Sequence, residues 1–290
     1  MSSREPAWLD RPGYPFSRRY ASLSAGRLHY VDEGQGEVVL FVHGTPTWSY
    51  EYRHLIAALS RTYRCVAPDH LGFGLSDRPA NFAYTPEAHA PVLAEFVQQL
   101  GLDRLTLVVH DFGGPIGLPL ALQAPSRVVR VVILNSWAWP LDDDPPLARG
   151  ARFIGGAAGR LLYKYANASL RLIMPSAYGD RRKLTHAIHR QYLEVFRDRN
   201  ARLLVLHALA KSLLGSRDFY QGLLNGLPAL RRLPVLIIWG MKDSAFKPYQ
   251  LARWQQLLPE AAVARLDEAG HWPHEEDPSR VIEEIARFLN

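Results

Sequence analysis

The chain has 290 residues, which fits one large domain that can bury a substantial core without disulfides or metals. Hydrophobic residues make up 48% of the sequence and charged residues 21%, and this balance excludes a disordered or collagen-like chain. The 34 Lys and Arg residues outnumber the 28 Asp and Glu residues, but they are scattered and form no long basic tract, so we expect no nucleic-acid partner.

The cellular compartment is indicated by cysteine usage and by the lack of targeting signals. Cys65 is the single cysteine of the sequence, which excludes an intrachain disulfide and is typical of a reducing compartment. Residues 1–6 lack the basic start and apolar run of a signal peptide, and no stretch reaches the roughly 18 apolar residues of a membrane span. We predict a cytoplasmic monomer or homodimer with no membrane partner.

Strand-like and helix-like segments alternate along most of the chain. Alternating hydrophobicity predicts a strand at 26–32, and continuous apolar runs predict strands buried on both faces at 38–42, 63–67, 105–110, 129–134, 234–239 and, more weakly, 261–266. Helical patterns lie between most of them, at 51–60, 86–100, 114–123, 248–257 and 278–289. This order predicts an α/β fold with a mostly parallel, doubly wound sheet whose site lies at the carboxyl ends of the strands.

One connection is far longer than the others. About ninety residues separate the strand at 129–134 from the strand at 234–239, which is too long for a plain loop, and their pattern is mainly helical. We therefore predict a core formed by residues 1–140 and 226–290, with a helical cap inserted at 141–225.

Asp111 is the first candidate for chemistry, because it stands between an apolar strand and a helix that opens with Phe112, Gly113 and Gly114. A nucleophile elbow places its reactive residue on such a strand-to-helix turn and needs small neighbours. The structural alternative for an aspartate shortly before two glycines is a helix N-cap. Asp111 is interpreted as a nucleophile only together with the residues described next.

His271 and Asp243 also follow predicted strands and complete a candidate triad. His271 lies between the last strand and the last helix, with His274 as its nearest rival, and Asp243 follows the strand after the cap. Nucleophile, acid and base thus occur in the chain order of α/β-hydrolases, in which the acid orients the histidine. Thr45, in the turn after an early strand, and Phe112 are the predicted donors of backbone N–H groups to an oxyanion.

These motifs together resemble the haloalkane dehalogenase and epoxide hydrolase branch of the α/β-hydrolases. The matching stretches are His43 to Tyr50, Pro68 to Asp77, His110 to Gly114, Trp239 to Asp243, and Gly270 with His271. The resemblance implies that Asp111 attacks a saturated carbon and forms an ester, and that His271, oriented by Asp243, activates water to hydrolyse it. It implies a small to medium apolar substrate, water and no cofactor or metal.

The leaving group is less defined by these motifs. Haloalkane dehalogenases typically carry a tryptophan where this chain has Phe112, and Asn or Glu where it has Thr45, so both halide-holding positions differ. Trp137 and Trp139 are alternative indole donors, with cap-to-core packing as their structural alternative. An epoxide hydrolase would instead need two cap tyrosines, for which Tyr178 is one of five candidates. A β-lactone-acting relative is a further alternative, and a non-catalytic scaffold is disfavoured by the triad.

Overall fold

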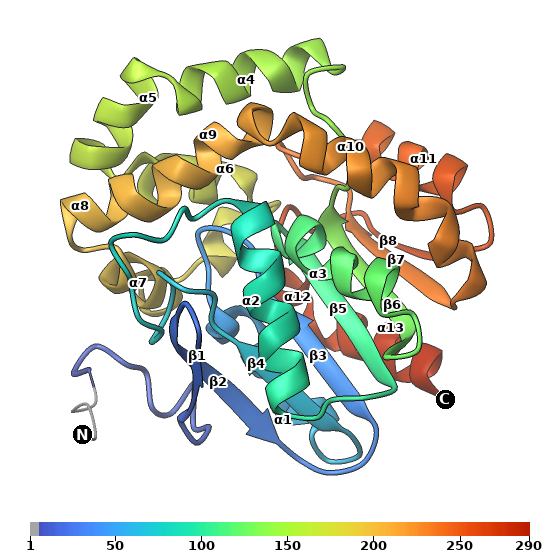
Figure 1. The fold of residues 1–290 in the computed structure, drawn as a ribbon. Helices are drawn as coiled ribbons and strands as arrows, with labels where there is room; N and C mark the ends of the chain where they lie inside the picture. Colours follow the sequence, from blue (N-terminus) through green and yellow to red (C-terminus); the bar gives the residue numbers. More distant parts are fainter. Residues whose placement is uncertain (1–5) are drawn as a thin grey trace.

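The computed structural model describes residues 6–290, so the stretch in which we expect no signal peptide lies almost entirely outside the described residues. Its centre is an eight-stranded sheet with the order β1-β2-β4-β3-β5-β6-β7-β8 (Figure 1). The pairs β1–β2 and β2–β4 are antiparallel and all others are parallel. The predicted α/β class with a mostly parallel sheet is therefore confirmed. The strands are β1 Arg19–Leu23, β2 Gly26–Glu33, β3 Val38–Val42, β4 Arg64–Pro68, β5 Leu105–Asp111, β6 Val128–Ser136, β7 Val235–Gly240 and β8 Ala262–Leu266.

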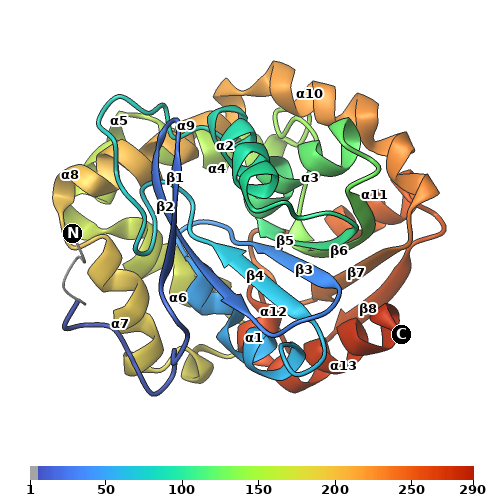
Figure 2. The same ribbon diagram turned by 60° about the horizontal axis from the view of Figure 1, so that its bottom comes forward.

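The central strands are apolar on both faces because helices cover both faces of the sheet. Every residue of β5 and of β7 is buried. Figure 2 shows α1 (Arg53–Leu59) and α13 (Pro278–Leu289) on one side, and α2 (Pro86–Gln99) and α3 (Gly113–Gln123) on the other. Helix α11 (Pro248–Leu257) connects β7 to β8.

Two local features differ from the expected pattern. Strand β1 was not predicted, since it is a short edge strand whose burial pattern leaves only Ala21 and Leu23 buried. The expected helix at 51–60 begins instead as a 3₁₀ turn, η1 (Ser49–Tyr52), before α1 starts at Arg53. Both differences concern element ends or edges, where the hydrophobic pattern is weakest.

The long connection between β6 and β7 is helical, and we call its residues 145–226 the cap. Helices α4, α5 and α9 form its outer layer, separated from the sheet (Figure 1). No helix within residues 6–290 is long and apolar enough to cross a membrane. The cap contains α4 Pro145–Gly155, α5 Ala157–Leu161, η2 Leu162–Ala166, η3 Ser169–Ile173, α6 Met174–Ala177, η4 Arg181–Lys183, α7 His186–Val195, α8 Arg199–Ala201, η5 Arg202–His207, α9 Ala208–Gly215 and α10 Arg217–Gly226. A final turn, η6 Leu227–Arg232, leads into β7.

A buried charge fixes the cap to the core. Glu275, in the short helix α12 (Pro273–Glu276), accepts two hydrogen bonds from the Arg53 guanidinium at 2.6 and 2.9 Å. The hydroxyl of Tyr192, in cap helix α7, donates to the same carboxylate. A carboxylate is expensive to bury unless its oxygens are paired, so these contacts hold α1, α12 and α7 in one arrangement.

Candidate active site

Asp111 occupies a strained strand-to-helix turn. It ends β5 with a φ of +50°, in the left-handed region that non-glycine residues seldom adopt, and α3 begins two residues later. A Cβ atom at Gly44 would lie 2.4 Å from the Asp111 Cβ, and one at Gly113 would lie 2.0 Å from the Val42 carbonyl oxygen. The glycines therefore leave the space that this turn requires, as in a nucleophile elbow.

The structure brings the three predicted triad residues together. The His271 Nε2 atom lies 3.4 Å from Asp111 Oδ2, and its Nδ1 atom lies 2.7 Å from Asp243 Oδ2. The other oxygen of Asp243 accepts hydrogen bonds from the backbone N–H groups of Ala245 and Phe246, at 2.7 and 3.0 Å. All three triad side chains are almost completely buried. The histidine thus sits between two carboxylates, one of which is held in place by the backbone after β7.

The charge state of His271 depends on both neighbours. Burial alone would lower its pKa, but the negative charge of Asp243 and the hydrogen bond to Asp111 raise the pKa of His271 to about 10. If the Asp111 carboxylate became an ester, one of the two neighbouring negative charges would disappear. The imidazole would then lose its proton more easily, which is the state that a general base needs.

We expect D111N to lower the pKa of His271 from about 10 by about one to three pH units, because the amide carries no negative charge. NMR titration of isotope-labelled histidine, with H271Q to assign the signal, measures this directly. D267N, which removes an exposed carboxylate, is the matched control and should leave the titration unchanged. An unchanged His271 titration in D111N would contradict the coupling of the two residues.

Asn135 positions the Asp243 carboxylate. The sequence motifs did not predict this contact. Its Nδ2 atom donates to Asp243 Oδ2 at 2.8 Å, and its Oδ1 atom accepts from the Gly240 backbone N–H at 2.8 Å. Its own backbone has a positive φ of 28°. The available signal was its place near the carboxyl end of β6, the strand next to the nucleophile strand.

Of the two predicted oxyanion donors, Thr45 contacts the Asp111 carboxylate. The Thr45 backbone N–H donates to Asp111 Oδ1 at 2.8 Å, and the Thr45–Pro46 peptide bond is cis. The Phe112 side chain packs edge-on against Trp137, with ring centroids 4.8 Å apart. Thr45 is therefore already placed to hold an oxygen of Asp111, and the role of the Phe112 N–H stays a prediction.

A cavity of about 350 Å³ opens onto Asp111 and His271 between the core and the cap. A wider groove of about 880 Å³ runs between residues 78–87 and the cap, but it contains no triad residue, so the smaller cavity is the candidate active site. The smaller cavity is mainly apolar, and its lining from the core includes Thr45, Pro46, Asp111, Phe112, Trp137, Phe246, His271 and Trp272. From the cap it includes Leu147, Ile154, Tyr163, Ile173, Met174 and Leu206.

Only one of the three predicted substrate contacts lies at this cavity. Trp137 lines it, but Trp139 packs against Trp254 with ring centroids 5.0 Å apart, and Tyr178 stacks on Trp272 at 5.2 Å. Neither Trp139 nor Tyr178 is part of the cavity wall: Tyr178 packs on Trp272, which lines the cavity, and Trp139 packs on Trp254, which does not. The expectation that these two contact the substrate is therefore corrected.

Trp272 was missed, although it directly follows His271. It lines the cavity and meets the His271 ring edge-on at 4.6 Å. The indole N–H groups of Trp137 and Trp272 and the Thr45 hydroxyl are buried and have no hydrogen-bond partner among the described residues. Three unpaired donors thus belong to side chains around the nucleophile.

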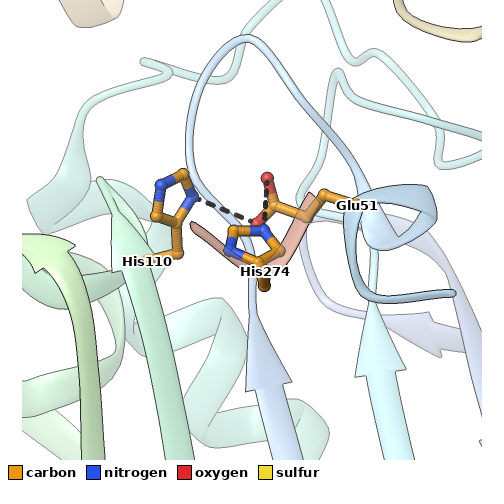
Figure 3. A group of neighbouring side chains, drawn as sticks. All are labelled: Glu51, His110 and His274. Atoms are coloured by element: carbon orange, nitrogen blue, oxygen red, sulfur yellow. Dashed lines mark ion pairs between the residues drawn. The ribbon is translucent and has the colours of Figure 1, made fainter. Parts of the chain in front are cut away.

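His274, the rival of His271, belongs to a separate group with His110, the residue before Asp111. Figure 3 shows its imidazole and that of His110 around the Glu51 carboxylate. His110 Nδ1 lies 3.3 Å from Glu51 Oε1, and His274 Nε2 lies 3.8 Å from Glu51 Oε2. Their ligand-type atoms lie within 4.8 Å of one another, and this is the group among residues 6–290 with the composition and spacing of a metal site.

The contacts around Glu51, His110 and His274 indicate a buried ion pair between a carboxylate and an imidazole. His110 Nε2 donates to the His271 backbone carbonyl at 2.8 Å, so a bond from Nδ1 to Glu51 needs a second proton and a positive ring. Burial alone would raise the pKa of Glu51, but the charge and hydrogen bond of His110 hold it well below its ordinary value. Burial lowers the pKa of the His274 imidazole, and the His110 Nδ1 atom is the nearer of the two to the Glu51 carboxylate, so Glu51 pairs mainly with His110. The pair links the segment before Asp111 to the backbone of His271.

We expect E51Q to lower the free energy of unfolding at pH 7 by about 3 kcal/mol, because it removes the charge that compensates buried His110. Chemical denaturation measures the difference, and E260Q, at an exposed carboxylate, should change stability by less than about 0.5 kcal/mol. A loss of stability on dialysis against EDTA in the wild type that is absent in E51Q would contradict the ion pair and indicate a metal.

Comparison with known proteins identifies the class. Residues 37–278 match the family described as the alpha/beta hydrolase fold, so the chain belongs to the α/β-hydrolase family. It is 39% identical over 276 residues to haloalkane dehalogenase 2 of Mycobacterium bovis, covering 94% of each chain. It is 34% identical over 284 residues to a cis-3-alkyl-4-alkyloxetan-2-one decarboxylase of Shewanella oneidensis, covering 95% of this chain and 89% of the relative. Within its family, the chain is a haloalkane dehalogenase-like enzyme.

Solved structures agree on the fold. A haloalkane dehalogenase from Bradyrhizobium elkanii superimposes with a TM-score of 0.83 at 23% identity, covering 94% of this chain and 96% of that one. An epoxide hydrolase superimposes with a TM-score of 0.77 at 24% identity, covering 94% and 98%. Likeness at this level of identity establishes the fold and leaves the substrate to the geometry of the site.

Proposed function

We propose that this enzyme hydrolyses haloalkanes through an ester on Asp111. The observation that carries the proposal is the Asp111 carboxylate, which lies between the Thr45 N–H and His271 at the wall of an apolar cavity. A carboxylate at the wall of such a cavity is poorly solvated and is in contact with any apolar molecule that binds there. The 39% identical haloalkane dehalogenase of Mycobacterium bovis supports the same class of substrate.

The proposed reaction has two steps. In the first, an Asp111 oxygen forms a bond to the carbon that bears the halogen, and the carbon–halogen bond breaks with its electron pair leaving on the halide. In the second, His271 takes a proton from water while the oxygen of that water adds to the Asp111 carboxyl carbon. The N–H groups of Thr45 and Phe112 hold the resulting oxyanion, and its collapse breaks the ester bond. The proton on His271 passes to the leaving alkoxide oxygen to give the alcohol, and the Asp111 carboxyl group then loses its proton to solvent, which restores the carboxylate.

The leaving halide needs hydrogen-bond donors, and the side chains around Asp111 offer them. Phe112 has no polar hydrogen on its ring, but Trp137 packs against it and carries an unpaired buried N–H. Trp272 and the Thr45 hydroxyl are the other two unpaired donors. Epoxide opening would require two acidic hydroxyls, and Tyr163 alone of the five cap tyrosines lines the cavity. The donor set therefore supports an anionic leaving group over an epoxide oxygen.

A second candidate is decarboxylation of a β-lactone. It is supported by the 34% identity to the oxetanone decarboxylase of Shewanella oneidensis over 95% of this chain. The same carboxylate, histidine and oxyanion donors could act on a four-membered lactone. Substrate identity separates the two candidates, since one reaction releases halide and the other carbon dioxide.

The test uses H271Q, which should form the ester without hydrolysing it. With a primary bromoalkane we expect a burst of about one bromide per chain and a mass increase on the peptide that contains Asp111. D111N should give neither signal. Parallel incubations with an epoxide and with a 3,4-dialkyl oxetan-2-one identify the alternative substrates. If the Asp111 peptide gains no mass with any of the three, the covalent mechanism is wrong.

W137F tests the proposed halide donor. It removes one indole N–H beside Phe112 and should lower kcat/KM for bromide release at least roughly tenfold, because a leaving-group donor acts mainly in the transition state. W139F is the matched control, since Trp139 is not part of the cavity wall and should change kcat/KM by less than about threefold. Equal effects of the two substitutions would remove Trp137 from the proposed role.

A further inference from the structure

The first part of the cap, residues 145–179, is cationic without any compensating acid. It contains no Asp or Glu, and it carries five cations, which account for five of the six net positive charges of the chain. These cations are Arg149, Arg152, Arg160, Lys164 and Arg171. The positive charge that appears scattered in the whole sequence is therefore concentrated in one structural unit.

None of these five cations forms an ion pair with a residue in the described part of the chain, and four of the five are exposed. Basic residues of the core are often paired, such as Arg64 with Asp32 and Arg130 with Glu37. The Lys164 Nζ atom lies 5.3 Å from the centroid of the neighbouring Tyr165 ring. The cap cations thus present their charge to the solvent or to a partner.

The same segment exposes large hydrophobic side chains. Seven such residues are exposed among those described, and six of them lie between residues 145 and 179. They are Phe153, Leu161, Leu162, Tyr165, Leu172 and Ile173, with exposed fractions of 36 to 59%. Helix α4 packs on α5 and α5 on η2, so most of these side chains belong to one continuous part of the outer layer of the cap (Figure 1). Exposed apolar side chains grouped in this way mark an interaction surface.

We propose that this surface, residues 149–173 of the cap, docks on an anionic phospholipid bilayer. Basic side chains interleaved with exposed Leu, Ile, Phe and Tyr are what an interfacial segment needs, because the cations meet lipid phosphates and the apolar groups enter the acyl boundary. A symmetric pair of chains joined through this surface would instead place five cations against five cations. Nucleic acid would leave the aliphatic groups without a partner. The prediction of no membrane partner rested on the lack of a spanning segment, which peripheral docking does not require.

The cavity opening borders this surface. Gly150 of α4 and Ile173 of η3 are both exposed and both line the cavity, so the two segments flank its opening. An apolar molecule dissolved in the bilayer would therefore meet the opening without crossing bulk water. This consequence rests on the proposed function, whereas docking itself does not.

The test measures sedimentation of the whole protein with vesicles of phosphatidylcholine containing 30% phosphatidylserine, and with phosphatidylcholine alone. We expect binding to the anionic vesicles, weaker binding to the neutral ones and release as NaCl is raised to 0.5 M. R152E/R171E should lower the partition coefficient at least roughly 25-fold, since each lost basic residue contributes about fivefold and the anionic surface repels the two new carboxylates. F153S/L172S should lower binding to both kinds of vesicle.

R61E/R232E is the matched control, because it makes the same change of net charge at two exposed arginines of the core. It should lower the partition coefficient by less than about threefold. Thermal melting and, if the proposed function holds, bromide release should be the same for all variants in the absence of vesicles, which separates failure of docking from failure of the enzyme. The proposal is overturned by absence of vesicle binding, by equal effects of the cap and core variants, or by a dimer in light scattering that F153S/L172S dissociates.

Discussion

The left-handed backbone at Asp111 is the constraint on which the rest of the site depends. It turns the carboxylate out of the line of β5, toward the Thr45 N–H and His271. The turn can form only because Gly44 and Gly113 have no side chains, since a Cβ at either position would overlap its neighbours. A strained residue persists when its surroundings over-determine it, and here a fully buried strand and two glycine contacts do so.

Each loop that carries a functional group is held by a buried carboxylate. Glu51 follows the turn of Thr45 and pairs with His110, Asp243 follows β7 and holds His271, and Glu275 follows His271 and pairs with Arg53. Every one of these charges is compensated by donors from another element, so that moving one loop would leave a charge unpaired. The site is in this way preorganised by electrostatics as much as by packing. Glu275 extends the same arrangement to the cap through Tyr192.

Around Asp111, the apolar wall and the hydrogen-bond donors come from different residues. Phe112 supplies an apolar wall next to Asp111 but no side-chain donor, and Trp137, at the end of the next strand, packs on that ring with an unpaired N–H. Trp272 brings a second indole from the loop after β8. The donors of the cavity wall thus come from several strand ends, because the carboxyl ends of parallel strands lie at the same edge of the sheet.

The sequence by itself determined the α/β class and most strand positions, because strongly apolar runs fix buried strands. It also singled out Asp111, Asp243 and His271 as triad candidates, because they follow predicted strands in the chain order of α/β-hydrolases. Only the tertiary structure decided which aromatic residues face the cavity. Trp137 and Trp139 differ by two positions in an irregular stretch, where no periodicity predicts the direction of a side chain, and packing places one at the cavity and the other against Trp254. Asn135 and the Glu51 pair join segments distant in sequence, so their partners became visible only once the strands were in register. The interaction surface on the cap likewise became apparent only from the exposure of its cations and their lack of acidic partners, which composition does not show.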